Sequence, residues 1–207
     1  MDRRMDMEPL DEKKFASRGG LKLDAALEHF GIDVAGATCV DLGCSTGGFV
    51  DCLVQRGAAK VFAVDTAYGE LAWKLRQDDR VVVLERTNAV HALPEDVAPK
   101  AAKGCDLVSI DLGWTKQERA IPVALRWLKA LSDLEGGAKA RIVSLIKPHY
   151  ESGQHKLTDD EADAETQRVV DEVLPGLGVE VEGWMRSPIR GGKGKNLEHL
   201  AVLKRRG

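Results

Sequence analysis

Short apolar runs typical of strands alternate with segments of helical pattern along most of this chain. The apolar runs lie at 38–42, 60–64, 80–84, 105–110 and 140–146. Helical patterns fill 20–30, 47–56, 69–77, 116–133 and 160–175. Such alternation predicts strand–helix–strand units, which form a mostly parallel sheet covered by helices on both faces.

The last part of the chain departs from this alternation. Strand patterns at 179–185 and 197–203 are joined only by a loop rich in glycine and lysine. Two strands with no helix between them pair antiparallel, because a parallel return needs a long crossover. The sequence therefore predicts an α/β fold with a seven-stranded, mostly parallel sheet whose last strand runs antiparallel.

Length and composition are those of an ordinary soluble protein. The chain has 207 residues, of which 43% are hydrophobic and 30% charged. We expect a flexible charged tail at 1–14 and a single domain over 15–207. The apolar runs are too short to span a bilayer, and the N-terminus has no signal-peptide pattern. These features indicate a cytoplasmic protein without membrane contact.

The cysteines and histidines show no metal-binding spacing. Cys39, Cys44, Cys52 and Cys105 lack a Cys-x-x-Cys pattern and have no paired histidines nearby. Buried free thiols are the prediction for all four, and no metal site is expected.

The charge of the chain is small overall but uneven. A net charge of −3 excludes the global basic field of many nucleic-acid binders. Between positions 186 and 206, however, Lys and Arg predominate, and Glu198 is the single acid. Such a stripe either binds phosphate groups or forms a solvated loop and tail, and charge alone favours the second.

A glycine-rich turn follows the first predicted strand. The segment from Asp41 to Phe49 reads Asp-Leu-Gly-Cys-Ser-Thr-Gly-Gly-Phe, so its glycines permit a tight turn and open the next helix towards a ligand. The spacing is not Gly-x-Gly-x-x-Gly, and an acid before the turn suits a ligand with an ammonium group and no pyrophosphate. The candidate ligand-binding residues here are Asp41, Gly43, Ser45, Thr46, Gly47, Gly48 and Phe49.

Polar residues also close the later strands. Asp65 follows the second strand, where it either accepts the hydroxyls of a ribose or caps the next helix. Asn88, after the third, either reads an adenine edge or serves a turn. Because the carboxyl ends of parallel strands meet at one edge of a sheet, these residues indicate a nucleoside-containing cofactor beside a reactive centre.

Four ionisable residues far apart in the chain form the candidate reactive centre: Lys22, Asp111, Lys147 and Glu198. Asp111 and Lys147 end the fourth and fifth apolar runs, and ionisable groups there are costly unless they are partnered or used. The four either form a buried salt-bridge network or activate a hydroxyl group. Catalysis is favoured, because apolar side chains would pack as well as four buried charges.

Six segments resemble a known family. They are Ser17-Arg-Gly-Gly-Leu-Lys-Leu23, Asp41 to Phe49, Ala63 to Arg76, Glu85-Arg-Thr-Asn88, Leu145-Ile-Lys-Pro148 and Asn196-Leu-Glu198. Together they are similar to the FtsJ-like S-adenosylmethionine methyltransferases, and within these to the TlyA branch. Members of that branch, often labelled hemolysins, act as ribosomal RNA 2'-O-ribose methyltransferases. The resemblance covers nearly all of residues 15–204.

The resemblance implies a Rossmann-like methyltransferase fold, S-adenosyl-L-methionine as cofactor and RNA, in particular ribosomal RNA, as partner. It places the Lys-Asp-Lys-Glu tetrad of the superfamily on the four residues named above. It places the methyl donor on the Asp41–Phe49 turn, Asp65, Asn88 and the backbone around Asp111. In the expected chemistry Lys147 is the base and Asp111 orients it. Lys22 stabilises the oxyanion and Glu198 holds it, although the sequence fits the reverse assignment of the lysines as well.

The chain also departs from the branch pattern. An S4-type RNA-binding domain precedes the Ser-Arg-Gly-Gly motif in the branch, whereas a charged tail of about sixteen residues, too short for such a domain, precedes it here. After Asp111 the sequence differs from the usual Val-Ser-Phe-Ile-like stretch, and Trp114 either stacks on a base or packs on the following helix. We expect the loop at 186–196 to arch over the site. The candidate RNA contacts are Arg18, Trp114, Arg190, Lys193 and Lys195.

Other classes of function fit parts of this pattern. A non-catalytic RNA-binding or ribosome-assembly factor would keep the fold, but the presence of all four candidate catalytic residues argues against it. A methyltransferase for a non-RNA acceptor is consistent with the short tail, because the tail leaves no room for an S4-type RNA-binding domain. No amphipathic or spanning segment supports a membrane-active hemolysin.

Overall fold

The computed structural model describes residues 11, 13–98, 101, 103–133, 140–192 and 195–207. Most of the predicted tail at 1–14, and Lys193, lie outside the described residues. In the described part of the chain, no helix has the length and apolar character needed to cross a bilayer. The four cysteines are buried and free, as predicted.

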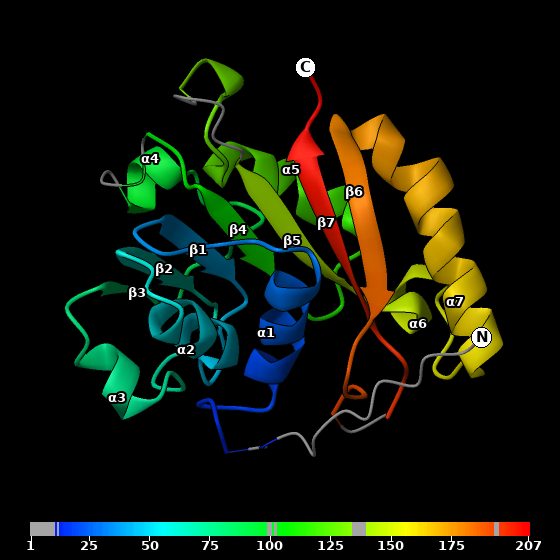
Figure 1. Ribbon diagram of the computed structural model, residues 1–207, viewed down its shortest axis with the longest axis horizontal. Helices are drawn as coiled ribbons and strands as arrows, with labels where there is room; N and C mark the ends of the chain where they lie inside the picture. Colours follow the sequence, from blue (N-terminus) through cyan, green and yellow to red (C-terminus); the bar gives the residue numbers. More distant parts are fainter. Residues whose placement is uncertain (1–10, 12, 99–100, 102, 134–139, 193–194) are drawn as a thin grey trace.

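The centre of the molecule is a seven-stranded sheet in the order β3-β2-β1-β4-β5-β7-β6 (Figure 1). Its strands are β1 (Thr38–Leu42), β2 (Lys60–Val64), β3 (Val81–Leu84), β4 (Leu107–Ile110), β5 (Arg141–Ile146), β6 (Val179–Arg186) and β7 (His199–Arg205). β7 runs antiparallel to both β5 and β6, and the remaining pairs are parallel. The predicted fold class is confirmed, including the antiparallel last strand.

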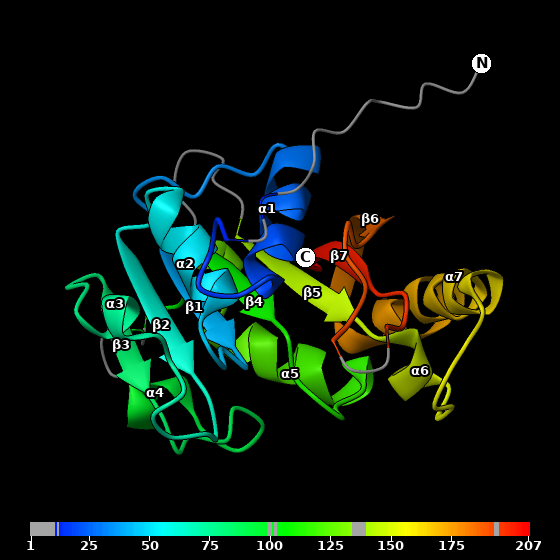
Figure 2. The same ribbon diagram turned by 90° about the horizontal axis from the view of Figure 1, so that it is seen from below.

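Helices cover both faces of the sheet, as the sequence predicted (Figure 2). The helices are α1 (Gly19–His29), α2 (Gly48–Gln55), α3 (Trp73–Arg76), α4 (Pro94–Val97), α5 (Gln117–Trp127), α6 (Pro148–Glu151) and α7 (Asp159–Arg168). In β1, Cys39 packs with the core under α1 and α2, whereas Val40 packs with the core under α5. Successive residues of a strand point to opposite faces, so a strand covered on both sides must be apolar throughout.

The helix predicted at 69–77 is shorter than expected, because α3 begins only at Trp73. Before it, backbone amides bind carboxylates and a distant carbonyl instead of forming a helix. Asp65 accepts from the amide of Ala67, Glu85 accepts from the amide of Gly69, and Thr46 accepts from Ala72. These long-range hydrogen bonds outweigh the local helical pattern.

The helix predicted at 116–133 also ends early, at Trp127. Leu128 is extended (ψ 136°) and forms an isolated parallel bridge with Cys105. The amide of Cys105 donates to the carbonyl of Trp127, and the amide of Lys129 donates back to Cys105. Pairing with the segment that leads into β4 therefore stops the helix. A short 3₁₀ turn follows at Leu131–Asp133.

The helix predicted at 160–175 starts one residue early and ends in irregular turns. Thr158 and Glu161 form a capping box at the start of α7. The helix continues as a π turn (Val169–Val173) and a 3₁₀ turn (Leu174–Leu177). Two short helices, α4 and α6, were not predicted, since four residues carry too little periodicity to be recognised.

Candidate active site

The turn after β1 lies against the loop after β4. Gly43 adopts a left-handed conformation (φ +93°), and a Cβ atom there would lie 2.5 Å from the carbonyl oxygen of Asp111. Only glycine permits this approach. Gly47 is also left-handed, but a Cβ on it would meet Leu75 of α3 at 2.4 Å. Gly43 therefore shapes the site, whereas Gly47 and the neighbouring Thr46 support the α3 segment.

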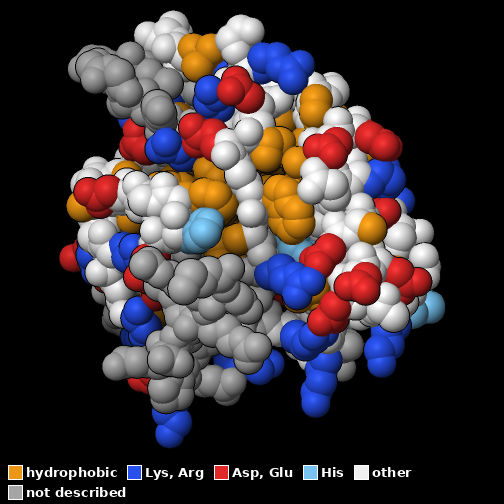
Figure 3. Space-filling view, turned by 45° about the vertical axis from the view of Figure 1, so that its right-hand side comes forward, with side chains coloured by type: hydrophobic (Ala, Val, Ile, Leu, Met, Phe, Trp, Pro, Cys, Tyr) orange, Lys and Arg blue, Asp and Glu red, His pale blue; other side chains and the backbone are white. Residues whose placement is uncertain are grey.

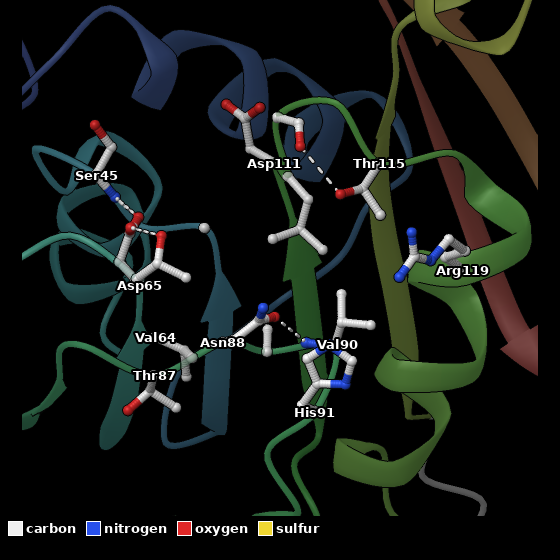
Figure 4. A pocket seen from close by; sticks show the side chains of 15 residues that line it. Ser45, Val64, Asp65, Thr87, Asn88, Val90, His91, Asp111, Thr115 and Arg119 are labelled. Carbon is white, nitrogen blue, oxygen red and sulfur yellow. Dashed lines mark hydrogen bonds between the residues drawn. The ribbon is translucent and has the colours of Figure 1, made fainter.

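A cavity of about 460 Å³ opens beside this turn at the carboxyl ends of β2 and β3 (Figure 4). Asp65 and Ser45 lie on one side of it, and Asn88 lies on the wall below Asp111. These four are predicted site residues, and the structure brings them together around one space. Lining residues that the sequence analysis missed include His91, Thr115 and Arg119.

The polar groups of this cavity are already ordered by the backbone. The Asp65 carboxylate accepts hydrogen bonds from the amides of Ser45 (2.7 Å) and Ala67 (2.8 Å). The Thr66 hydroxyl also lies 3.5 Å from Asp65 Oδ1, so about one of the roughly four acceptor positions of the carboxylate remains for a ribose hydroxyl. The Oδ1 atom of Asn88 accepts from the amide of Val90. Asn88 is thus both a turn residue and a cavity residue, and its amide NH₂ is the group left to donate.

A second cavity of about 270 Å³ shares Gly43, Ser45 and Asp111 with the first. It is lined by further predicted residues: Arg18, Lys22, Asp41, Gly48, Phe49 and Arg190. Since Asp111 lies between the two spaces, a ligand in the first would reach the ionisable groups of the second. Arg18 and Arg190 therefore lie beside the candidate reactive centre.

The four candidate catalytic residues form two close pairs. Lys22 Nζ lies 2.6 Å from Glu198 Oε2, and their side chains are only 9% and 5% exposed. Lys147 Nζ lies 2.5 Å from Asp111 Oδ1, with side chains 14% and 27% exposed. Each lysine meets the carboxylate that the sequence analysis assigned to it. The Lys147–Asp111 pair is the more accessible of the two and borders the shared space.

Burial raises the pKa of Asp41, at the end of β1, to about 8. The hydrogen bond from Ser109 (2.8 Å) opposes this shift, and the Asp111 charge adds to it. Asp41 is therefore largely protonated at neutral pH.

This raised pKa makes stability depend on pH. Between the ordinary value of 3.8 and about 8, the folded state holds a proton that the unfolded state has released. The contribution of Asp41 to the free energy of unfolding is complete below pH 3.8 and is lost as the pH rises through about 8. Relative to Asp41→Asn, the wild-type free energy of unfolding should fall by about 1.4 kcal/mol per pH unit between pH 5 and 8. Urea unfolding without added ligand measures this difference, and parallel curves for the two proteins would contradict it.

A third cavity, of about 660 Å³, adjoins the second, with which it shares Gly192. Its wall includes Trp114, which is 80% exposed and stacks on Tyr150 with ring centroids 4.7 Å apart. Trp114 thus packs on Tyr150 of α6. Lys147 Nζ lies 5.7 Å from the centre of the Tyr150 ring, and Glu198 also lines the cavity.

The loop between β6 and β7 is tied to α7 by ion pairs. Arg190 pairs with Asp159 (2.7 Å), and Arg186 at the end of β6 pairs with Asp163. Lys195 is exposed, and its carbonyl accepts from Arg190. On the face shown in Figure 3, acidic and basic side chains are intermixed and form no broad basic field. The loop therefore borders the second and third cavities, as expected, but its arginines are partly neutralised by α7.

Comparison with known proteins agrees with this geometry. Residues 15–194 match the FtsJ-like methyltransferase family. The chain is 39% identical over 199 residues to the 16S/23S rRNA (cytidine-2'-O)-methyltransferase TlyA of Mycobacterium tuberculosis, covering 93% of this chain and 69% of the relative. A solved, hemolysin-labelled protein from Streptococcus thermophilus superimposes with a TM-score of 0.81 at 33% identity, covering 96% of this chain and 69% of that one. An S-adenosylmethionine dependent methyltransferase from Mesorhizobium loti shares the fold at 15% identity, with a TM-score of 0.57 and coverage of 87% and 96%.

The fold and the arrangement of its strand ends define a Rossmann-like methyltransferase. The chain belongs to the FtsJ-like methyltransferase family, and its similarity to TlyA bears out the resemblance drawn from its motifs. It spans about two thirds of the length of the curated relatives it matches.

Proposed function

We propose that this protein transfers a methyl group from S-adenosylmethionine to a ribose 2'-hydroxyl of RNA, in particular of ribosomal RNA in the cytoplasm. The observation that carries the proposal is the pair of lysine–carboxylate contacts, Lys22–Glu198 and Lys147–Asp111, of which Asp111 lines a nucleoside-sized cavity and Lys22 lines the cavity beside it. A single domain over residues 15–207 would hold the cofactor and the catalytic residues.

The residues around the first cavity fit the proposed cofactor. Asp65 would hold a ribose hydroxyl, Asn88 would donate to the adenine, and the turn at Gly43 would lie against the methionine part. Bound S-adenosylmethionine supplies an electrophilic methyl group. The protonated Asp41 supports the turn through its hydrogen bond with Ser109.

The chain's own residues would activate the acceptor. Lys147 Nζ would take the proton of the ribose hydroxyl, because its partner Asp111 lines the space shared by the first two cavities. Asp111 would keep the amine directed at the hydroxyl. Lys22 would stay charged against Glu198 and stabilise the oxygen as it gains negative charge.

RNA contacts are proposed for Arg18, Trp114, Arg190 and Lys195, which surround the second and third cavities or lie on the adjoining loop. Lys193, also a candidate, is not among the described residues. A non-catalytic assembly factor and a methyltransferase for another kind of acceptor are not favoured, because the relatives' names specify ribosomal RNA methylation.

The proposal is tested by mapping 2'-O-methyl groups in total RNA from cells with and without the gene. A site that disappears with the gene and returns with the wild-type gene, but not with an inactive variant, supports it. Identical maps in every RNA would contradict it, even if the purified protein binds S-adenosylmethionine.

A glycine in the loop over the site offers a local test of the geometry. A Cβ on Gly191 would lie 2.5 Å from Glu198 Oε1, so Gly191→Ala must push this carboxylate away from Lys22. We expect methyl transfer to fall about 10–100-fold, as displaced catalytic groups do. Gly192→Ala is the matched control, because a Cβ there meets nothing within 4 Å. Equal activity of the two variants would show that the position of Glu198 is unimportant.

A further inference from the structure

His199, the first residue of β7, is a fully buried polar residue with two hydrogen-bond partners on α7. Its Nε2 atom lies 2.7 Å from Asp163 Oδ1, and its Nδ1 atom lies 2.8 Å from Thr166 Oγ1. The preceding residue, Glu198, contacts Lys22 of α1 instead. A buried polar ring is costly unless it is hydrogen-bonded, and an apolar side chain would also fill this place. The two bonds of His199 are therefore features that need a reason.

The protons of this network follow from the charges of its members. Burial lowers the pKa of His199, so the ring is neutral at pH 7 and carries a single N–H. The hydrogen bond from Arg186 lowers the pKa of Asp163, so its carboxylate is charged and can only accept. Nε2 must then carry the proton, and Nδ1 accepts from the Thr166 hydroxyl. Both ring nitrogens are satisfied in one orientation, which fixes the ring on α7.

The carboxylate of Asp163 also binds the last residue of β6. Arg186 Nε donates to Asp163 Oδ1 at 3.0 Å, and Arg186 Nη2 donates to Oδ2. Two parallel bonds between a guanidinium and a carboxylate fix direction as well as distance. Arg186 ends β6, His199 begins β7, and the two lie opposite each other in the sheet. Asp163 thus holds both ends of the loop at 187–198 against α7.

The position of Glu198 depends on this loop, because Glu198 is its last residue. The Glu198 carbonyl accepts from the amide of Ser187, the first residue of the loop, at 2.8 Å. The backbone at Gly191 lies so close to the Glu198 carboxylate that a Cβ there would be 2.5 Å from Oε1. A shift of either loop end would therefore move the carboxylate that holds Lys22.

The register of β7 links His199 to the other catalytic pair as well. His199 lies opposite Ile146, the last residue of β5, and Lys147 follows Ile146 directly. Neighbouring strands exchange backbone hydrogen bonds, so a displaced His199 would also disturb the backbone that carries Lys147. One buried side chain thus adjoins the backbone of both catalytic pairs.

We infer that Asp163 and His199 are positioning residues, which fix the two ends of the loop at 187–198 and thereby hold Glu198 against Lys22. The inference rests on the proposed function. It adds residues that act through Glu198, since neither of them is among the residues that line the three cavities.

Three substitutions of His199 test the bond to Asp163. Glutamine places its amide nitrogen near the position of Nε2 and can keep this bond, so His199→Gln should retain kcat within about threefold. Asparagine is too short to reach Asp163, and phenylalanine fills the space without a donor. Both variants should lower kcat about tenfold, with KM for S-adenosylmethionine unchanged, because Asp65 and Asn88 lie on other strands. Equal kcat in all three variants, after correction for the folded fraction, overturns the inference.

A second set of variants tests the carboxylate. Asp163→Asn should also lower kcat about tenfold, and adding His199→Asn should cause little further loss, because both changes break the same contact. Glu165→Gln is the matched control, since this acid of α7 pairs with Arg168 at 2.7 Å and should leave kcat unchanged. Losses from Asp163→Asn and His199→Asn that multiply in the double variant would contradict a shared role.

A third measurement does not depend on methyl transfer. Crystal structures of wild type, His199→Asn and His199→Gln give the distance from Lys22 Nζ to Glu198 Oε2, which is 2.6 Å here. This distance should lengthen by about 1 Å in the asparagine variant and stay unchanged in the glutamine variant. An unchanged distance in His199→Asn overturns the inference and leaves the proposed function intact. A lengthened distance supports the inference even if the wild type methylates no RNA, in which case the proposed function alone fails.

Discussion

Lys147→Met should reduce methyl transfer to RNA by about 10²–10⁴-fold, the usual contribution of a proton-transfer group. The reason is that Nζ lies 2.5 Å from Asp111, which lines the space shared by the first two cavities, where an acceptor hydroxyl would lie. Methionine keeps the length of the side chain and removes only the amine. Affinity for S-adenosylmethionine should therefore stay within about twofold, and isothermal titration beside a labelled-methyl assay measures both quantities.

The chain contains a matched control pair at the start of β4, the strand that ends just before Asp111. Lys129 Nζ lies 2.5 Å from Asp106, just before β4, whereas Asp111 directly follows β4. Lys129→Met removes a lysine–aspartate pair of the same length, far from the cavities, and should leave turnover unchanged. If Lys147→Met retains most of its activity, Lys147 is not the base, and the same assay on Lys22→Met then tests the reverse assignment.

The pairing of the four ionisable residues was predictable, because burial limits the partners that a charged side chain can have. Asp111 and Lys147 end neighbouring apolar runs, and a buried charge needs an opposite charge within reach. Pairing of β4 with β5 then brings these two strand ends together. The same reasoning located Asp65 and Asn88, since carboxyl ends of parallel strands meet at one edge.

Other parts of the site could not be predicted, because they depend on how distant elements are placed. Arg119 faces the first cavity only through the orientation of α5 on the sheet. The segment before α3 is not helical because carboxylates of other elements take its amides. Asn196 lines the third cavity with its Nδ2 atom donating to the carbonyl of His155, forty-one residues away. No local pattern contains these contacts.

The buried pair Lys22–Glu198 gives the second large effect and separates catalysis from a structural role. Lys22→Met leaves a carboxylate that is only 5% exposed without its partner. Removing one member of a buried pair costs about 3–5 kcal/mol, and the reverse single variant, Glu198→Leu, should cost a similar amount. In urea unfolding, Lys204→Met, which breaks an exposed pair with Glu180, should change stability by about 1 kcal/mol or less.

The double variant Lys22→Met/Glu198→Leu decides between the two roles of this pair. Replacing both charges with apolar side chains of similar volume removes the unpaired charge, so most of the lost stability should return. Methyl transfer should not return, because the cation that stabilises the developing oxyanion is absent. A double variant that regains both stability and activity would mean that the pair only holds α1 against the segment before β7. A stable but inactive double variant requires that the charge itself takes part in the reaction, since the packing has been restored.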